Sequence, residues 1–154
     1  MKQDRFLQII LVFIILLVVI AVGIFLLRGN DQSYGTDDSP EGVVRNYTLA
    51  IQNMDFERAY SYLADNPNKP DFESFRFSFL NQRMDTTNTS IQIGATRTAG
   101  TNEAFVDVAV IYSPSGIFSS PYSNGEIASL TKQSQSWKIE SMPYPYWAWE
   151  WYQP

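Results

Sequence analysis

Apolar residues follow three successive patterns along this chain of 154 residues. Residues 6–27 form an almost continuous apolar run in which Gln8 is the one clearly polar side chain. Residues 39–84 carry apolar side chains at spacings of three and four, which is typical of amphipathic helices. From residue 89 onward apolar positions recur at every second residue, which is typical of strands. The order predicts one apolar helix, then a helical region, then a sheet.

The apolar run is long enough to cross a bilayer. A helix over residues 6–27 measures roughly 33 Å, which is close to the thickness of the hydrocarbon core, and none of its faces is polar. A cleaved signal peptide is the alternative, but its apolar region normally spans about 7–15 residues and ends in a polar cleavage region. Here Gly23 is followed by further apolar residues. We therefore predict a single uncleaved transmembrane helix with the bilayer as a partner.

The basic residues beside this run indicate its orientation. Lys2 and Arg5 precede it, whereas Arg28 alone follows before the acidic Asp31. An excess of basic residues marks the cytoplasmic side of a span. We expect a cell-membrane, single-pass protein with a cytoplasmic N-terminus and an extracytoplasmic C-terminal domain.

Three helices are predicted after the span. Ser39 is a suitable N-cap and Pro40 suits the first helical position, while Asp55 and Asp71 are suitable caps for two further helices. Phe77 lies off the main apolar face and is a candidate contact residue. The side chains expected to face inward are Val43, Val44, Tyr47, Ala50, Ile51, Phe56, Ala59, Tyr60, Leu63, Phe72, Phe75, Phe79 and Leu80.

Four strands complete the pattern, over residues 89–98, 103–113, 124–133 and 136–142. The second strand is apolar on both faces, with only Asp107 charged after its first residue, so we expect it at the centre with something packed on each side. The predicted fold class is α+β: an N-terminal transmembrane helix, followed by two to three helices packed on a curved antiparallel sheet of about four strands.

A family resemblance agrees with this order. The spacing of Pro40, Val43, Tyr47, Ala50, Asp55, Ala59 and Leu63 resembles the opening of small bacterial domains of the nuclear transport factor 2-like superfamily, and SWKIESM (136–142) resembles their last strand. The resemblance implies a cone-shaped α+β domain, a fold that hosts enzymes, carriers and scaffolds. The predicted organisation is a stub and span (1–28), a flexible tether (29–38), the NTF2-like domain (39–142) and an aromatic tail (143–154).

Composition narrows the chemistry. The chain has no His and no Cys, which removes the commonest general base and all thiolate chemistry. Residues 29–154 carry 8 basic and 15 acidic residues, so nucleic acid is not an expected partner. No catalytic, cofactor or metal site is predicted. Tyr60 and Asp107 are the weak pocket candidates, although we favour Asp107 facing solvent or pairing with an arginine such as Arg97.

The tail, PYPYWAWEWYQP, concentrates aromatic residues. Pro143 and Pro145 lack an amide donor and interrupt strand pairing. We predict an extended ribbon beyond them, with three tryptophans on its buried side, because a helix would group only Trp147 and Trp151. Its partner is left open among the chain's own sheet, the membrane interface, another protein and a sugar or small molecule. The candidate interaction surface comprises Tyr144, Tyr146, Trp147, Trp149, Trp151 and Tyr152, with Tyr146 and Tyr152 on the outward side.

These features predict a non-catalytic protein whose extracytoplasmic domain acts as an accessory or scaffold subunit beside other membrane proteins. The alternative is a binding module that holds a small apolar or aromatic ligand in the cone. An isomerase-like or dehydratase-like enzyme is the third hypothesis and the least favoured, because the fold's histidine-based arrangements are impossible here.

Overall fold

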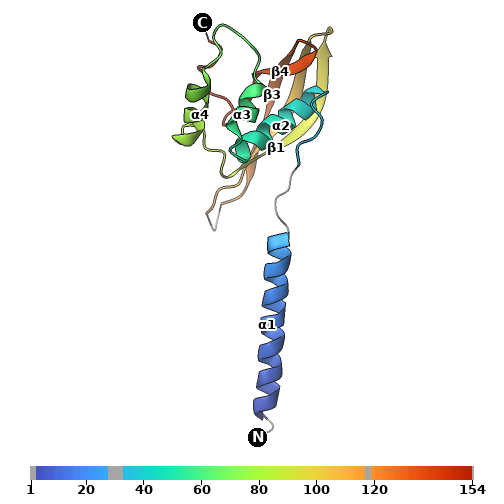
Figure 1. Ribbon diagram of the computed structural model, residues 1–154, viewed down its shortest axis with the longest axis vertical. Helices are drawn as coiled ribbons and strands as arrows, with labels where there is room; N and C mark the ends of the chain where they lie inside the picture. The colour runs from blue at the N-terminus through green and yellow to red at the C-terminus, as the bar shows by residue number, and fades with distance from the viewer. Residues whose placement is uncertain (1–2, 28–32, 117–118, 154) are drawn as a thin grey trace. The chain divides into compact units, whose positions relative to one another are not determined.

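The computed structural model describes residues 3–27, 33–116 and 119–153, and within the first range it describes the side chains of residues 7–23. The chain divides into two compact units, Met1–Ser33 and Tyr34–Pro154. The first unit contains α1 (Gln3–Leu27), a single helix (Figure 1) whose large apolar side chains between Leu7 and Val22 are exposed. Among the residues described, no helix combines the length and apolar character needed to cross a membrane. The span predicted over residues 6–27 includes side chains outside that description.

Three helices open the second unit: α2 (Pro40–Gln52), α3 (Phe56–Ser61) and α4 (Phe72–Leu80). Each begins at the cap that the sequence predicts. The side chains of Ser39, Asp55 and Asp71 accept hydrogen bonds from the backbone N–H groups of residues 42, 58 and 74, which satisfies donors that a helix start leaves free.

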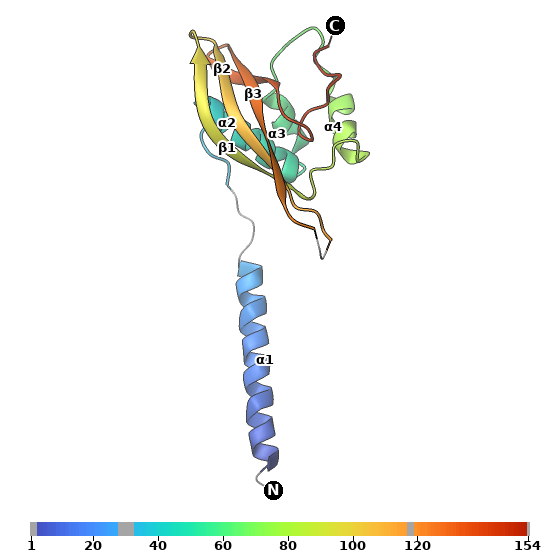
Figure 2. The same ribbon diagram turned by 180° about the vertical axis from the view of Figure 1, so that it is seen from behind.

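The four predicted strands form one antiparallel sheet in the order β1-β2-β3-β4. They are β1 (Thr89–Ala99), β2 (Glu103–Tyr112), β3 (Tyr122–Gln133) and β4 (Ser136–Ser141). Figure 1 shows α2 and α3 against one face of the sheet, and Figure 2 shows the sheet in front of these helices. The predicted α+β class, with three helices and four antiparallel strands, is confirmed for this unit.

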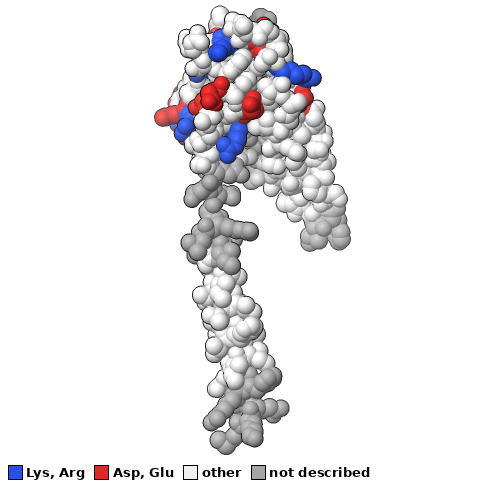
Figure 3. Space-filling model, turned by 90° about the vertical axis from the view of Figure 1, so that its right-hand side faces the viewer, with Lys and Arg blue, Asp and Glu red and all other residues white. Residues whose placement is uncertain are grey.

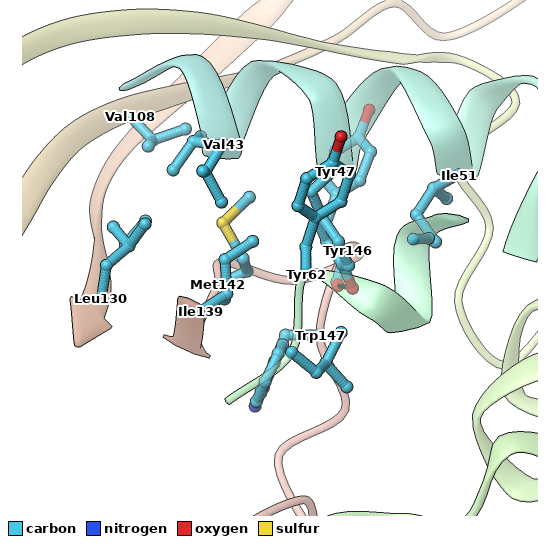
Figure 4. Packing of buried hydrophobic residues seen from close by; sticks show 14 of the residues in the cluster. Val43, Tyr47, Ile51, Tyr62, Val108, Leu130, Ile139, Met142, Tyr146 and Trp147 are labelled. Carbon is cyan, nitrogen blue, oxygen red and sulfur yellow. Dashed lines mark hydrogen bonds between the residues drawn. The ribbon is translucent and has the colours of Figure 1, made fainter. Parts of the chain in front are cut away.

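The core lies between α2 and the sheet. Val106, Val108 and Val110 alternate along β2 and are buried toward the helices, opposite Val43 and Tyr47 of α2. Figure 4 shows Val43, Tyr47 and Val108 among the buried side chains gathered beneath α2. Burying each large apolar side chain contributes about 1.5–3 kcal/mol. All five inward residues predicted for this helix are buried, but Leu80 of α4, predicted to face inward, is 52% exposed.

The other face of the sheet is less covered than the sequence predicts. Phe105 of β2 and Ile127 of β3 are exposed by 36% and 52%, so the prediction that β2 is packed on both sides holds for the helix side only. In Figure 3, Lys and Arg are interspersed with Asp and Glu over the part of the domain that carries charge. Residues 108–125 contain no charged side chain.

The outer edge of β4 is occupied by the chain that follows α3. Leu63 forms a parallel bridge with Ile139 of β4. The N–H of Ile139 donates to the carbonyl of Tyr62 (2.8 Å), and the N–H of Ala64 donates to the carbonyl of Ile139 (2.9 Å). The tail therefore cannot continue the sheet beside β4, because that edge already has a partner.

Residues 34–38, which we call the leading segment, are attached to the domain rather than being part of a flexible tether. The amide of Asn46 pairs with the backbone of Gly35 through two hydrogen bonds of 2.9 Å, and Tyr62 donates to Asp37 at 3.1 Å. The guanidinium of Arg58 lies 3.7 Å from the centre of the Tyr34 ring. The tether predicted over residues 29–38 is wrong for this half, and residues 28–32 lie outside the described chain.

Candidate functional site: the aromatic tail

The tail leaves β4 and folds back over the domain in a series of turns (Figure 2). Its aromatic residues have opposite environments. Tyr146, Trp147 and Trp151 are at most 7% exposed, whereas Tyr144 and Trp149 are 56% and 82% exposed. The tail is thus divided into a buried part and a displayed part, and the two alternate along the sequence.

Tyr146 is the centre of the buried part. Its carbonyl accepts a hydrogen bond of 2.7 Å from the Tyr47 hydroxyl, and its own hydroxyl lies 3.2 Å from Gln52 Nε2 and 3.1 Å from Thr89 Oγ1. Burial raises the pKa of both Tyr47 and Tyr146 above the ordinary tyrosine value, because the phenolate would lose hydration. These bonds fasten the tail to α2 and to the start of β1.

Trp147 and Trp151 extend the core toward α4. Their ring centres are 5.1 Å apart at an edge-to-face angle of 73°, and the Trp151 ring lies 5.2 Å from Phe75 and 6.1 Å from Phe79. Figure 4 shows Trp147 on the side of the cluster away from α2. Tyr152 packs against Trp147 at 5.3 Å and donates a hydrogen bond to the carbonyl of Ala64. The tail therefore fills the space between the sheet and α4.

The extended ribbon predicted for the tail is wrong. Turns at residues 144–145 and 149–152, with a bend at residues 146–147, put Trp147 and Trp151 on one side and Trp149 on the other, which is the grouping that helical spacing would give. Tyr146, predicted to face outward, is fully buried. The physical reason is that a strand needs a free sheet edge, and the edge of β4 is occupied by residues 62–64.

Tail residues from both the displayed and the buried part line a cavity of about 350 Å³. Tyr144, Trp147 and Trp149 contribute aromatic surface, and Met84 and Met142 contribute flexible apolar surface. Methionine adapts its shape to different partners, and Tyr and Trp dominate binding hot spots. This composition suits the binding of another molecule through apolar contact.

A second cavity of about 420 Å³ lies next to the first and is lined by Phe77 of α4, which is 63% exposed. The two cavities share Ser78, Arg83 and Glu150. Arg83 Nη2 lies 2.7 Å from Glu150 Oε1, so an ion pair joins the segment that follows α4 to the tail, where the two cavities meet. We call the two cavities together the tail groove.

The weak pocket candidates are not brought together. Asp107 lies on the face of the sheet away from the helices and pairs with Arg97 at 2.6 Å, in a hollow of about 370 Å³ lined by Gly94 and Gly125. Tyr60 packs edge-to-face on Phe75 and donates to the Pro70 carbonyl at 2.8 Å. Tyr60 and Asp107 therefore do not line the same pocket. The favoured interpretation, that Asp107 pairs with an arginine, is confirmed.

Sequence reasoning missed the polar and sulfur-bearing parts of the groove. Arg83 and Met84 follow α4, and Met142 follows β4. Only the three-dimensional path of the tail brings them beside Trp149. Within the described ranges, no group of three or more Asp or Glu side chains is arranged to hold a metal ion.

No protein-family model and no curated protein sequence matches the chain. Its structure is similar to the solution structure of a SEC-C motif-containing protein from Rhodopseudomonas palustris, with a TM-score of 0.50 and 15% identity over 70% of this chain and 79% of that one. It is also similar to an NTF-2-like protein of unknown function from Shewanella oneidensis MR-1, with a TM-score of 0.47 and 9% identity over 63% of this chain and 88% of that one. At these identities the likeness concerns the fold alone, and the second match is too distant to carry an argument. An NTF-2-like protein is among the structural neighbours of this chain. Membership of this chain in the nuclear transport factor 2-like superfamily stays a prediction.

Proposed function

We propose that this chain is a non-catalytic accessory or scaffold subunit that binds another membrane protein through its tail groove. The observation that carries the proposal is Trp149, which is 82% exposed on a tail whose neighbouring rings are packed in the core. A displayed indole on a rigid support, next to an apolar cavity, has the properties of an interface hot spot.

The membrane location is proposed from the sequence of α1. Residues 6–27 are apolar on all sides, and a helix of this kind is stable in lipid rather than in water. The basic residues before the run favour a cytoplasmic N-terminus. The second unit, from Tyr34 onward, is then extracytoplasmic.

Single-cysteine labelling tests this arrangement, since the natural chain has no Cys. Thr101→Cys, in the exposed turn between β1 and β2, should react with a membrane-impermeant maleimide in intact cells, whereas Gln3→Cys should react only after the cells are opened. A Thr101→Cys variant that stays unlabelled in intact cells would contradict the proposed topology.

The alternative, a binding module with a ligand inside the cone, has less support. The interior between α2 and the sheet is occupied by Tyr47, Tyr146 and the valines of β2. Tyr146 is held there by three hydrogen-bonding partners. A ligand in this position would have to displace the tail from the core.

A photo-crosslinking residue at position 149 tests the interaction directly. In native membranes we expect an adduct of one defined mass at position 149 and none at the control position Thr101, which is exposed on the opposite end of the sheet from the tail's attachment to β1. An equal yield at both positions, or no adduct at 149, would count against an interaction through the tail groove.

A further inference from the structure

We propose that Glu150 is the anionic centre of a cation site in the tail groove, and that Arg83 occupies this site until a lysine or arginine of the partner replaces it. The inference rests on the proposed function and names the chemistry of the partner: a protein segment that presents one basic side chain between apolar residues. Three observations support it.

The first observation is the incomplete pairing of the Glu150 carboxylate. Oε1 accepts a hydrogen bond from Arg83, but Oε2 is buried and has no hydrogen-bond partner among the described residues. A buried carboxylate oxygen without a donor is unfavourable. The pair with Arg83 therefore leaves the carboxylate incompletely satisfied, and Oε1, the oxygen that Arg83 now holds, is the one that a partner's ammonium or guanidinium would take.

The second observation is the weak attachment of Arg83. Its side chain is 58% exposed, and within the described part of the chain the pair with Glu150 is the one hydrogen bond and the one ion pair of its guanidinium. An ion pair this exposed contributes at most about 1 kcal/mol. Replacing it by an intermolecular pair is therefore inexpensive, and Arg83 can turn outward without disturbing the core.

The third observation is the surroundings of the pair. Trp149 and Tyr144 supply exposed aromatic faces in the same cavity as Glu150, and cations bind such faces. Met84 and Met142 supply apolar walls for the residues that flank the cation. Residues 34–154 carry 8 basic and 14 acidic side chains, so the charge of the unit attracts a basic segment.

Binding of blocked tripeptides to the full chain in mild detergent tests the inference. The probe has arginine between two leucines, and the matched control has norleucine in place of arginine. The readout is the indole N–H signal of Trp149 by NMR, assigned with Trp149→Phe. We expect the arginine peptide to bind about tenfold more tightly than the norleucine peptide, as a charge-assisted bond in a partly shielded site would give.

Two variants then separate a cation site from a structural ion pair. Glu150→Gln and Arg83→Gln break the same internal ion pair. If the pair matters only for the stability of the fold, both variants should change peptide affinity in the same direction. We expect Glu150→Gln to abolish the preference for arginine, and Arg83→Gln to tighten arginine binding about three- to fivefold because the competing side chain is gone.

Weaker binding in both variants, equal binding of the two peptides, or no shift with either peptide would overturn the cation site. The crosslink at position 149 reports separately on the proposed function. If the crosslink forms and the arginine preference is absent, the groove is an interface of another chemistry; if the crosslink is absent, the interaction itself is refuted.

Discussion

The leading segment and the tail are two stretches outside regular helices and strands that attach to the same domain by different means. The leading segment is held by hydrogen bonds between polar groups, chiefly those of Asn46, Asp37 and Tyr62. The tail is held by aromatic side chains buried in the core, chiefly Tyr146 and Trp151. Water competes for the first kind of contact and not for the second. The tail should therefore unfold only with the domain, whereas the leading segment should detach from it locally.

The largest effect is expected from Trp151→Ala. Trp151 is 5% exposed and contacts Phe75, Phe79 and Trp147. Removing a buried tryptophan from such a core costs about 3–5 kcal/mol in the free energy of unfolding. Urea denaturation of the full chain, followed by circular dichroism, measures the change. A loss below about 1 kcal/mol would mean that the tail is not part of the core.

Alkaline pH should weaken the attachment of the tail next. The pKa values of Tyr47 and Tyr146 are raised in the folded state by burial, so the folded protein keeps protons that the unfolded chain releases above pH 10. The contribution of these two tyrosines to the free energy of unfolding is complete below pH 10 and falls as the pH rises, by at most about 1.4 kcal/mol per pH unit for each tyrosine. Urea denaturation between pH 9 and 11 measures the slope.

Tyr47→Phe should reduce that slope and also lower stability at neutral pH. It leaves the Tyr146 carbonyl without its donor, at a cost of about 1–3 kcal/mol. A slope that is the same in the wild type and in Tyr47→Phe would contradict the role given to this hydroxyl.

A smaller and local effect is expected from Gly42→Ala. Alanine normally stabilises a helix interior by about 1 kcal/mol relative to glycine. At position 42, however, a Cβ atom would clash with the carbonyl oxygen of Thr36, so the leading segment must move away. We expect faster amide hydrogen exchange at Gly35, with the core amides of β2 unchanged. Unchanged exchange at Gly35 would show that the leading segment is not held over α2 as described.

The smallest effect on stability is expected from Trp149→Ala. Trp149 is the same residue type as Trp151 but is 82% exposed, and exposed positions usually change stability by less than about 0.5 kcal/mol. Binding of the arginine tripeptide, followed in this variant through the NMR signals of the peptide's own leucine methyl groups, should nevertheless be lost, because the aromatic wall is removed. A large loss of stability would place Trp149 in the core instead.

The regular elements of the second unit were predictable because each depends on local signals. Ser39, Asp55 and Asp71 mark the helix starts through their own hydrogen-bonding capacity. The alternation of valines along β2 marks the buried face of the sheet. Such patterns need no knowledge of distant residues, and they were enough to predict the α+β class and the succession of helices and strands along the chain.

The tail and the leading segment were not predictable in the same way, because their conformations depend on distant partners. The alternating tryptophans indicate a strand only if a sheet edge is free, and residues 62–64 occupy that edge. Residues 34–38 have the polar composition of a linker. Their attachment depends on hydrogen bonds with Asn46 and Tyr62, which are distant in the sequence. The groove residues Arg83 and Met84 carry no sequence signal of their own, since only the folded tail brings them beside Trp149.

The central claim is that the tail buries Trp147 and Trp151 while displaying Trp149. Incorporation of 5-fluorotryptophan gives one fluorine NMR signal for each of the four tryptophans, and a soluble paramagnetic agent broadens each signal according to its exposure to solvent. Single Trp→Phe variants assign the signals. We predict the strongest broadening for Trp149 and the weakest for Trp147 and Trp151. Equal broadening of the three tail tryptophans, or a protected Trp149, would contradict both the packed tail and the interface proposed on it.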